Sequence, residues 1–505
     1  MQRMRTATWL AATLGVVATG STAWAQDATC INIVGNEPIS EQQSLDPAFS
    51  KGSDDAIHVW PVYEPLVRLD DQLQPIPQLA TSWEPSADGT QWTFHLREGV
   101  TFHDGSAFDA ADVVYTYRRL LDPATASPGA AEINFLTPDS IEAVDPLTVR
   151  FTTAQPVAAL PVSIASKMAA IVPEGATSEQ LATTMNGTGP FMADQVTQGG
   201  PVAVYKKNPN YWMAGEPKAD CIRITAVDQA VSLTTALLSG EADFAPYIDA
   251  TTAVTLKDNP DATIYTSKAG IVYTLSAMVD REPFTDVRVR KALKMVMDRQ
   301  ALVDVAVLGF GEPANDNPHP PSVAGAYTTE VPQQDIKGAK ALLAEAGYAD
   351  GLEIDIYSAD VLPGLVVMAE AYAQMAALAG ITVRVNRVPA DSFWTETWMQ
   401  KSFVTDAWSL RPIGNALNLV YRSDAPWNET HWQRPEFDAL LDQARVEIDD
   451  TKRAELYSQA QRMLAEEGGV IVPVFAYTIA AMRSNCSGYV SAPGTTPDFR
   501  QLHCE

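Results

Sequence analysis

Short stretches in which apolar and polar residues alternate mark the first half of the chain. The segment 89–99 (GTQWTFHLREG) places Trp92, Phe94 and Leu96 on one face. This period of two predicts a half-buried strand, and the Asp88-Gly89 pair at its start favours a hairpin turn. The same reasoning predicts strands in 31–34 (INIV), 145–152 (DPLTVRFT) and 221–227 (CIRITAV).

Apolar residues at helical spacing dominate the second half. In residues 286–300, Val289, Leu293 and Val296 share one face, and Thr285 is the expected helix cap. Alternation of such helices with strands predicts an α/β protein, and 505 residues are too many for one ordinary core. Further helices are predicted over 335–347, 434–448 and 451–469, with strands over 352–358, 381–388 and 469–477.

The first 25 residues have the pattern of a secretory signal peptide. Basic residues come first, an apolar run covers 9–17, and small residues stand at Ala23 and Ala25. The apolar run is too short to span a bilayer stably. We therefore expect cleavage after Ala25 and an exported, periplasmic protein.

Charge and cysteine content narrow the possible partners. The chain has 35 basic and 62 acidic residues, a net charge of −27, which argues against nucleic acid and anionic membranes. Four cysteines in an oxidising compartment predict disulfides, and three pairings are possible. We favour Cys30 with Cys221 and Cys486 with Cys504. A metal site is the alternative, but none of these spacings is the short one that zinc sites use.

The sequence shows no recognisable catalytic motif. The segment 187–190 (GTGP) lacks the serine of a nucleophile elbow, and the six histidines are scattered singly. A pair of carboxylates acting on glycans needs only closeness in space, so a secreted hydrolase remains an alternative. An uneven placement of tryptophan is the stronger signal, because it is typical either of core packing or of a small-molecule pocket. Trp394, Trp398, Trp408, Trp427 and Trp432 fall close together, with Arg411 among them.

Eight short segments, taken together, carry a resemblance to a known family. They are 44–50 (SLDPAFS), 62–70 (VYEPLVRLD), 79–123, 186–191 (NGTGPF), 206–212 (KKNPNYW), 237–244 (LLSGEADF), 284–299 and 340–348 (KALLAEAGY). In this order and with these gaps, the chain resembles the family 5 extracellular solute-binding proteins of ABC importers, which carry peptides, nickel chelates, opines and some sugars.

The resemblance implies a two-lobed periplasmic binding protein fold of type II that closes on its ligand. Lobe one would take residues 26–275 and 475–505, with an extra subdomain at about 50–180, and lobe two would take 276–474. Two crossing segments, 269–273 and 472–476, would form the hinge. The expected partners are a small-molecule ligand and the permease and ATPase of an importer. No enzyme activity, cofactor or metal is expected, and the protein should be a monomer.

The resemblance also directs attention to Arg411. Peptide-binding members carry an acidic run just after the matching tryptophan, where an aspartate pairs with the ligand's ammonium group, but residues 408–415 (WSLRPIGN) contain no carboxylate. Dipeptide binders also have an arginine at the start of the helix that matches 365–377, and here that helix opens with Leu365. An ordinary free dipeptide is therefore disfavoured.

We hypothesise that Arg411 binds an anionic or strongly polar group of the ligand. The alternative is a loop arginine that is solvated, stacked on tryptophan, or paired with Asp406 or Asp424. A peptide or amino-acid-derived ligand is preferred, with opines and oligosaccharides as alternatives. Nickel-chelate binding is a further alternative, but this sequence has no histidine cluster. A role as a receptor that signals to a sensor kinase is also left open. Trp394, Trp398 and Trp408 would supply flat apolar walls, and Asn415 and Tyr247 complete the candidate ligand-binding residues.

Overall fold

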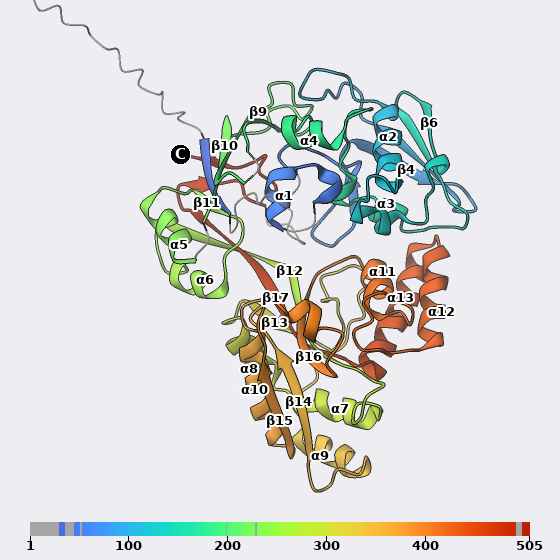
Figure 1. Cartoon of the computed structure of the whole chain (residues 1–505), viewed down its shortest axis with the longest axis vertical. Coiled ribbons are helices and arrows are strands. Elements are labelled where there is room, and N and C mark those ends of the chain that lie inside the picture. The colour runs from blue at the N-terminus through green and yellow to red at the C-terminus, as the bar shows by residue number, and fades with distance from the viewer. Residues whose placement is uncertain (1–29, 36–44, 51–52, 198, 228–229, 491–496) are drawn as a thin grey trace, which may run out of the picture.

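A computed structural model of the whole chain shows two lobes joined by two long strands (Figure 1). The strands β12 (Ala262–Ala277) and β17 (Val470–Arg483) pair antiparallel along most of their length and run from one lobe into the other. The structure describes residues 30–35, 45–50, 53–197, 199–227, 230–490 and 497–505. The expected signal peptide, residues 1–25, lies outside the described residues.

One sheet of 11 strands passes through both lobes. Its order is β15-β14-β16-β12-β17-β11-β1-β10-β9-β8, with β13 paired to β17. The segments predicted as a hinge lie side by side in this sheet, because Ile271 pairs with Ala476 and Tyr273 pairs with Val474. A register shift between Ser267 and Ile271 interrupts the pairing just before this point.

Lobe one is the half that contains β1 and the start of β12. Its parallel strands β1 and β10 bring Cys30 directly opposite Cys221, and the two form a disulfide. The elements of lobe one are β1 (Cys30–Gly35), η1 (Pro47–Phe49), α1 (Ser53–Val59), α4 (Ser178–Thr184), β8 (Phe191–Gln195), β9 (Val202–Lys207), β10 (Cys221–Ala226), α5 (Ala230–Ser239), β11 (Phe244–Ala245), α6 (Ala250–Leu256), β18 (Cys486–Ser487) and β19 (His503–Cys504).

A smaller sheet with its own core is attached to lobe one, and we call it the subdomain. Trp92, Phe94 and Leu96 are all buried in it, as their alternation predicts, and the Asp109 side chain caps the long helix that covers the sheet. Its strands run in the order β4-β5-β7-β6. Its elements are β2 (Val67–Leu69), β3 (Pro75–Pro77), β4 (Ala80–Pro85), β5 (Gln91–Leu96), α2 (Ala110–Leu121), η2 (Pro128–Ile133), η3 (Pro138–Ser140), β6 (Ile141–Asp145), β7 (Thr148–Thr152), α3 (Leu160–Ser163) and η4 (Lys167–Ala169).

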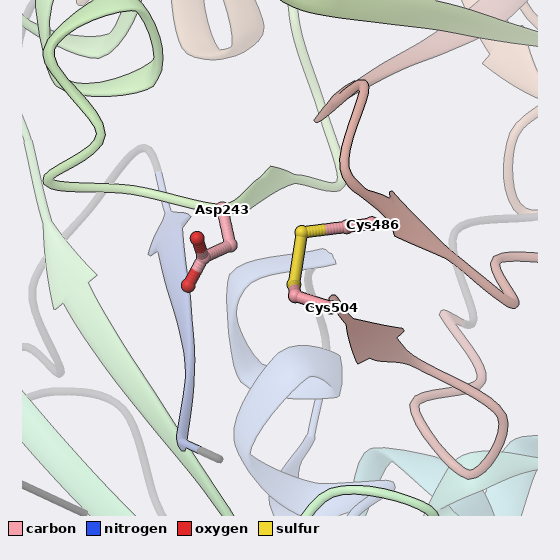
Figure 2. Close-up of side chains that lie close together, drawn as sticks. All are labelled: Asp243, Cys486 and Cys504. Carbon is pink, nitrogen blue, oxygen red and sulfur yellow. A yellow bond between two sulfur atoms is a disulfide. The ribbon is translucent and has the colours of Figure 1, made fainter. Parts of the chain in front are cut away.

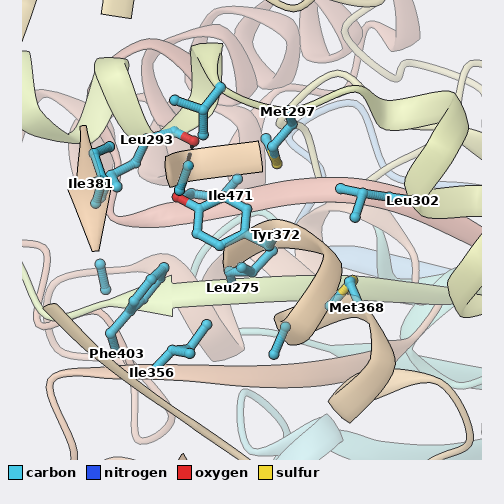
Figure 3. Packing of buried hydrophobic residues seen from close by; sticks show 14 of the residues in the cluster. Leu275, Leu293, Met297, Leu302, Ile356, Met368, Tyr372, Ile381, Phe403 and Ile471 are labelled. Carbon is cyan, nitrogen blue, oxygen red and sulfur yellow. Dashed lines mark hydrogen bonds between the residues drawn. The ribbon is translucent and has the colours of Figure 1, made fainter. Parts of the chain in front are cut away.

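Lobe two packs helices on a sheet whose strands alternate with them. Figure 3 shows its main core, in which Leu293, Tyr372 and Phe403 come from different elements and are all buried. The elements of lobe two are α7 (Val287–Met295), α8 (Arg299–Ala306), β13 (Gly311–Pro313), α9 (Ile336–Glu345), β14 (Leu352–Ser358), α10 (Leu365–Ala377), β15 (Ile381–Arg387), η5 (Phe393–Thr397), β16 (Phe403–Ser409), α11 (Ile413–Ala416), η6 (Leu417–Tyr421), α12 (Pro435–Val446) and α13 (Asp450–Glu467).

The predicted helices and strands are present, with one capping error and one break: the stretch 286–300 forms α7 and the start of α8, which are separated at residues 296–298. The helix α12 begins at Pro435, and α13 ends at Gly468, as the sequence indicates. Thr285 does not cap α7, because the side chain of Asp286 accepts the backbone N–H of Arg288 at that end. None of the helices in the described ranges is both long and apolar enough to cross a membrane.

The second disulfide joins Cys486 to Cys504 on the paired strands β18 and β19. Figure 2 shows Asp243 beside it, close enough for the three residues to resemble a metal site. However, the sulfurs are bonded to each other, and the Asp243 carboxylate accepts the backbone N–H of Asn32 at 2.8 Å. Both disulfides therefore follow the pairing that the sequence favoured, and this trio is not built as a metal centre.

Candidate ligand-binding cavity

Arg411 stands where strand β16 leaves the central sheet. The backbone N–H of Leu410 still donates to the carbonyl of Gly270 in β12, and the short helix α11 begins two residues after Arg411. The Nε2 of His319 lies 3.2 Å from the backbone carbonyl oxygen of Arg411. Burial lowers the pKa of His319 to about 4, so the ring is neutral near pH 7, and its Nε2–H donates to that carbonyl. The sheet and a buried histidine thus fix the backbone at Arg411.

A cavity of about 190 Å³ lies between the loop after β16 and lobe one. Lobe two contributes Leu410, Arg411, Pro412 and Asn415 to its lining. The other wall comes from the residue that follows α1 and from the subdomain: Trp60, Arg68, Leu69, Leu73, Glu132, Val162, Ser163, Ala165, Ser166 and Lys167. Two of the predicted site residues, Arg411 and Asn415, therefore line one cavity between the lobes.

The two arginines that line the cavity differ in how their charges are balanced. Arg68 forms an ion pair with Asp498 at 3.1 Å and also lies over the Trp60 ring. Burial by itself raises the pKa of Asp498, but Arg68 and Arg500 lower it to about 2. Arg411 forms neither a hydrogen bond nor an ion pair through its side chain with any residue in the described part of the chain. Its only close aromatic neighbour there is Trp427, whose ring centroid is 5.9 Å from the guanidinium carbon.

Burial lowers the pKa of Arg411, and the charge of Glu132 acts in the opposite direction. Neither alternative pairing considered from the sequence occurs, because Asp406 is buried elsewhere and Asp424 pairs with Arg422 at 2.8 Å. A half-buried guanidinium without a paired anion is the arrangement expected where an anionic ligand binds.

The tryptophans expected as apolar walls form a cluster behind the cavity. The rings of Trp398, Trp408 and Trp427 lie 5.7 to 6.4 Å apart, and Trp394 is 49% exposed at the edge. None of Trp394, Trp398 and Trp408 is among the residues that line the 190 Å³ cavity. Trp408 instead borders a much smaller void of about 10 Å³ that also touches Arg411.

A buried carboxylate holds this tryptophan cluster. The Glu429 carboxylate accepts hydrogen bonds from the indole N–H groups of Trp398 (2.7 Å) and Trp408 (3.2 Å) and from the hydroxyl of Ser276 (2.8 Å). Asp406 lies beside it on β16 and is 1% exposed. Burial and the charge of Glu429 raise the pKa of Asp406 well above its usual range, and its Oδ2 accepts no hydrogen bond from the described residues.

Tyr247 is not among the residues that line the cavity. It follows β11 and packs against the apolar cluster of lobe one that includes Phe244. The sequence did not suggest the other twelve lining residues as site residues, Trp60, Glu132 and Leu73 among them. The only signal for them was the position of Trp60 just before the VYEPLVRLD segment, because their closeness to Arg411 exists only once the lobes meet.

Leu73 connects the two walls. It lies in the turn between β2 and β3 with a positive φ of 60°, is 4% exposed, and belongs to the apolar cluster of lobe two that contains Leu410 and Ile413. A second contact forms farther along the interface, where the backbone N–H of Ala158 donates to the carbonyl of Arg445 at 3.0 Å. The lobes therefore touch on two sides of the cavity.

Three of the segments that carry the family resemblance, 62–70, 186–191 and 206–212, meet at Glu64. Its carboxylate accepts hydrogen bonds from the side chains of Gln78, Thr188, Tyr211 and Trp212. The glycines of the NGTGPF segment allow this convergence, because a Cβ at Gly187 would lie 2.0 Å from the carbonyl oxygen of Val62. Burial raises the pKa of Glu64, and three of these hydrogen bonds oppose that shift. Glu64 thus ties three of these segments together within lobe one.

Comparison with known proteins agrees with this architecture. The sequence profile of the bacterial extracellular solute-binding proteins, family 5 Middle, matches residues 74–428. The chain belongs to this family. It is therefore a solute-binding protein, whose role is to capture a ligand, and its fold is the two-lobed α/β fold of type II periplasmic binding proteins.

Individual relatives cover most of the chain. It is 29% identical over 456 residues to the glutathione-binding protein GsiB of Escherichia coli K12, covering 86% of this chain and 88% of that protein. It is also 29% identical over 479 residues to heme-binding protein A of Haemophilus influenzae, covering 86% and 85%. The structure of HbpA2 from Haemophilus parasuis superposes with a TM-score of 0.82 at 25% identity, covering 94% of this chain and 100% of that one.

Proposed function

We propose that this solute-binding protein is exported to the periplasm and captures a peptide or amino-acid-derived small molecule between its two lobes. It then delivers the molecule to the permease and ATPase of an ABC importer, acts as a monomer, and carries out no chemical conversion. Family membership supports the transport role. The N-terminal pattern of residues 1–25 supports export after cleavage at Ala25.

The choice of ligand site rests on one observation. Arg411 lines a cavity between the lobes, is half-buried, and has no anion bound to it among the described residues. A guanidinium in such a place gains most from a carboxylate or phosphate that binds through two parallel hydrogen bonds. Asn415 lines the same cavity and adds an amide donor and acceptor.

The lobes act as a clamp in this proposal. Lobe one comprises residues 26–275 and 475–505, with the subdomain at about 50–180, and lobe two comprises 276–474. The ligand contacts both walls only when the lobes are closed, so its binding energy shifts the equilibrium towards the closed form. The hinge for this closure lies in the paired strand segments 269–273 and 472–476.

The lining of the cavity favours an amino-acid-derived ligand over the other classes. Two relatives of equal identity are named for glutathione and for heme, so the names alone do not decide the ligand. A cavity of about 190 Å³ is far too small for a heme, since a cavity of about 150 Å³ binds a molecule of the size of benzene. An oligosaccharide would need aromatic stacking, and among the described residues Trp60 is the one tryptophan in this lining, where the Arg68 guanidinium already lies over its ring.

The proposal is tested by mass spectrometry of the small molecule released when the purified protein is denatured. We expect wild type to release a stoichiometric amino-acid-derived compound and the Arg411→Ala variant to release little, with an unchanged melting temperature of the ligand-free protein. Arg462→Ala, an exposed arginine on α13, is the matched control. Equal ligand content in Arg411→Ala contradicts the site, and a chemically altered compound after incubation would indicate a hydrolase instead.

A further inference from the structure

Glu132 faces Arg411 from the opposite wall of the cavity. It lies in η2 of the subdomain, is half-buried, and lines the same 190 Å³ cavity. No ion pair or side-chain hydrogen bond joins it to any residue of the described ranges. One acidic and one basic side chain, each without a bonded partner there, therefore approach one space from different lobes.

The two charges influence each other without direct contact. Among the described residues, Glu132 is the charged group that acts on the pKa of Arg411, which it raises against the effect of burial. Arg68, the other arginine of the lining, already has Asp498 as its partner at 3.1 Å. Lys167, the third cation of the lining, lies on the lobe-one side and has an interaction of its own. Among the charged groups without a bonded partner in the described ranges, the cavity thus offers a carboxylate on the lobe-one side and a guanidinium on the lobe-two side.

We propose that Glu132 is a specificity-determining residue and that the ligand is an amphoteric compound of about amino-acid size. Its anionic group binds Arg411 on lobe two, and its ammonium group binds Glu132 on lobe one. This inference rests on the proposed function, because it assigns the second charge of the same ligand. The polarity is the reverse of the peptide-binding pattern, in which a lobe-two aspartate takes the ammonium group.

Size and closure both support this assignment. An apolar cavity of about 150 Å³ accommodates benzene, so about 190 Å³ accommodates one small compound. The anionic group of an amphoteric ligand would bind lobe two and its ammonium group would bind lobe one. Both charges are therefore neutralised only when the lobes meet. A ligand with one charge would leave either Glu132 or Arg411 unpaired in the closed state, at a free-energy cost.

The test uses the full mature protein, refolded free of ligand, and measures thermal shift and titration calorimetry with defined probes. The amphoteric probes are the twenty amino acids, ω-amino acids of two to six carbons, and N-carboxyalkyl amino acids, which together span a range of distances between the charges. The matched probes are their N-acetyl derivatives and the corresponding dicarboxylates. The variants are Glu132→Gln and, as a control, Asp139→Asn, an exposed acid of the same subdomain.

We expect at least one amphoteric probe to stabilise wild type and its N-acetyl derivative to fail. Glu132→Gln should weaken binding of that probe about 10- to 100-fold, the range for loss of a charge-assisted hydrogen bond, while Asp139→Asn binds normally. The inference is overturned if no amphoteric probe binds, or if Glu132→Gln binds it as tightly as wild type. Binding of dicarboxylates that depends on Arg411 but not on Glu132 would overturn this inference and leave the proposed function intact.

Discussion

Each lobe supports its wall of the cavity on a buried carboxylate, and the two carboxylates differ in how their charge is held. In lobe one, Glu64 accepts hydrogen bonds from four neutral side chains. In lobe two, Glu429 accepts three, but a second carboxyl, Asp406, lies beside it with an oxygen that accepts no hydrogen bond from the described residues.

The difference indicates that the two walls respond differently to protons. Burial raises the pKa of Glu64 as well, but hydrogen bonds from Tyr211, Trp212 and Thr188 oppose that shift, so its carboxylate is part of the packing of the lobe-one wall. Asp406 is stabilised when it carries a proton, because burial and the neighbouring charge of Glu429 raise its pKa. The same acid-to-amide substitution should therefore have opposite effects in the two lobes.

The largest expected effect is that of Glu64→Gln. Glutamine offers one acceptor oxygen in place of two, so at least one buried donor such as Trp212 Nε1 loses its partner. We expect the free energy of unfolding to fall by about 2–3 kcal/mol in chemical denaturation. Glu98→Gln, an exposed acid of the subdomain, is the control, and an equally stable Glu64→Gln would show that Glu64 does not hold this wall.

Replacement of Leu73 tests the contact between the walls. Leu73 is 4% exposed because it packs into the apolar cluster of lobe two, and opening the lobes would return it to water. Leu73→Ser should destabilise the closed form by about 2 kcal/mol, which corresponds to a loss of ligand affinity of about 10- to 30-fold.

Calorimetry with the copurified ligand measures this loss. Ile76→Ser is the matched control, because Ile76 lies on the same hairpin and is 39% exposed. Equal affinities of Leu73→Ser and wild type would mean that this leucine does not help to close the lobes.

Asp406→Asn should give a smaller effect of the opposite sign. A raised pKa means that the folded protein keeps a proton that the unfolded chain releases, so stability falls as the pH rises above about 3.8 towards the folded pKa. Asparagine mimics the protonated form, so we expect a gain of about 1 kcal/mol near pH 8 and no gain near pH 4.

Melting temperatures of wild type and Asp406→Asn, measured from pH 4 to pH 8, check this prediction. The difference between them should grow steadily with pH. A constant difference, or a less stable variant at pH 8, would show that Asp406 is charged in the folded protein and that the two carboxylate centres are alike.

The parts of the molecule that the sequence predicts are those that depend on near neighbours. The period of two in 89–99 gives the buried face of β5, and Pro435 marks the start of α12, because both signals are local. Arg411 and Asn415, which were proposed because their segment departs from the pattern of the resembling family, both line the cavity. Thr285 was a wrong cap because Asp286, one residue later, reaches the same backbone group.

The rest depends on contacts between distant segments. Glu132 and Arg411 are about 280 positions apart along the chain and meet only where the subdomain faces the loop after β16. The sequence suggested that the tryptophan cluster forms a pocket wall. In the structure, hydrogen bonds from the indole N–H groups of Trp398 and Trp408 to Glu429 hold these two rings behind the cavity. No periodicity in the sequence predicts either arrangement.

Small-angle X-ray scattering tests most directly whether the two lobes close around a captured molecule. The protein is measured after removal of its copurified ligand by refolding, and again after that ligand is restored, with Arg411→Ala treated in parallel. We predict that the ligand lowers the radius of gyration of wild type and leaves that of Arg411→Ala unchanged. A wild-type radius of gyration that does not change when the ligand binds would contradict closure around the cavity.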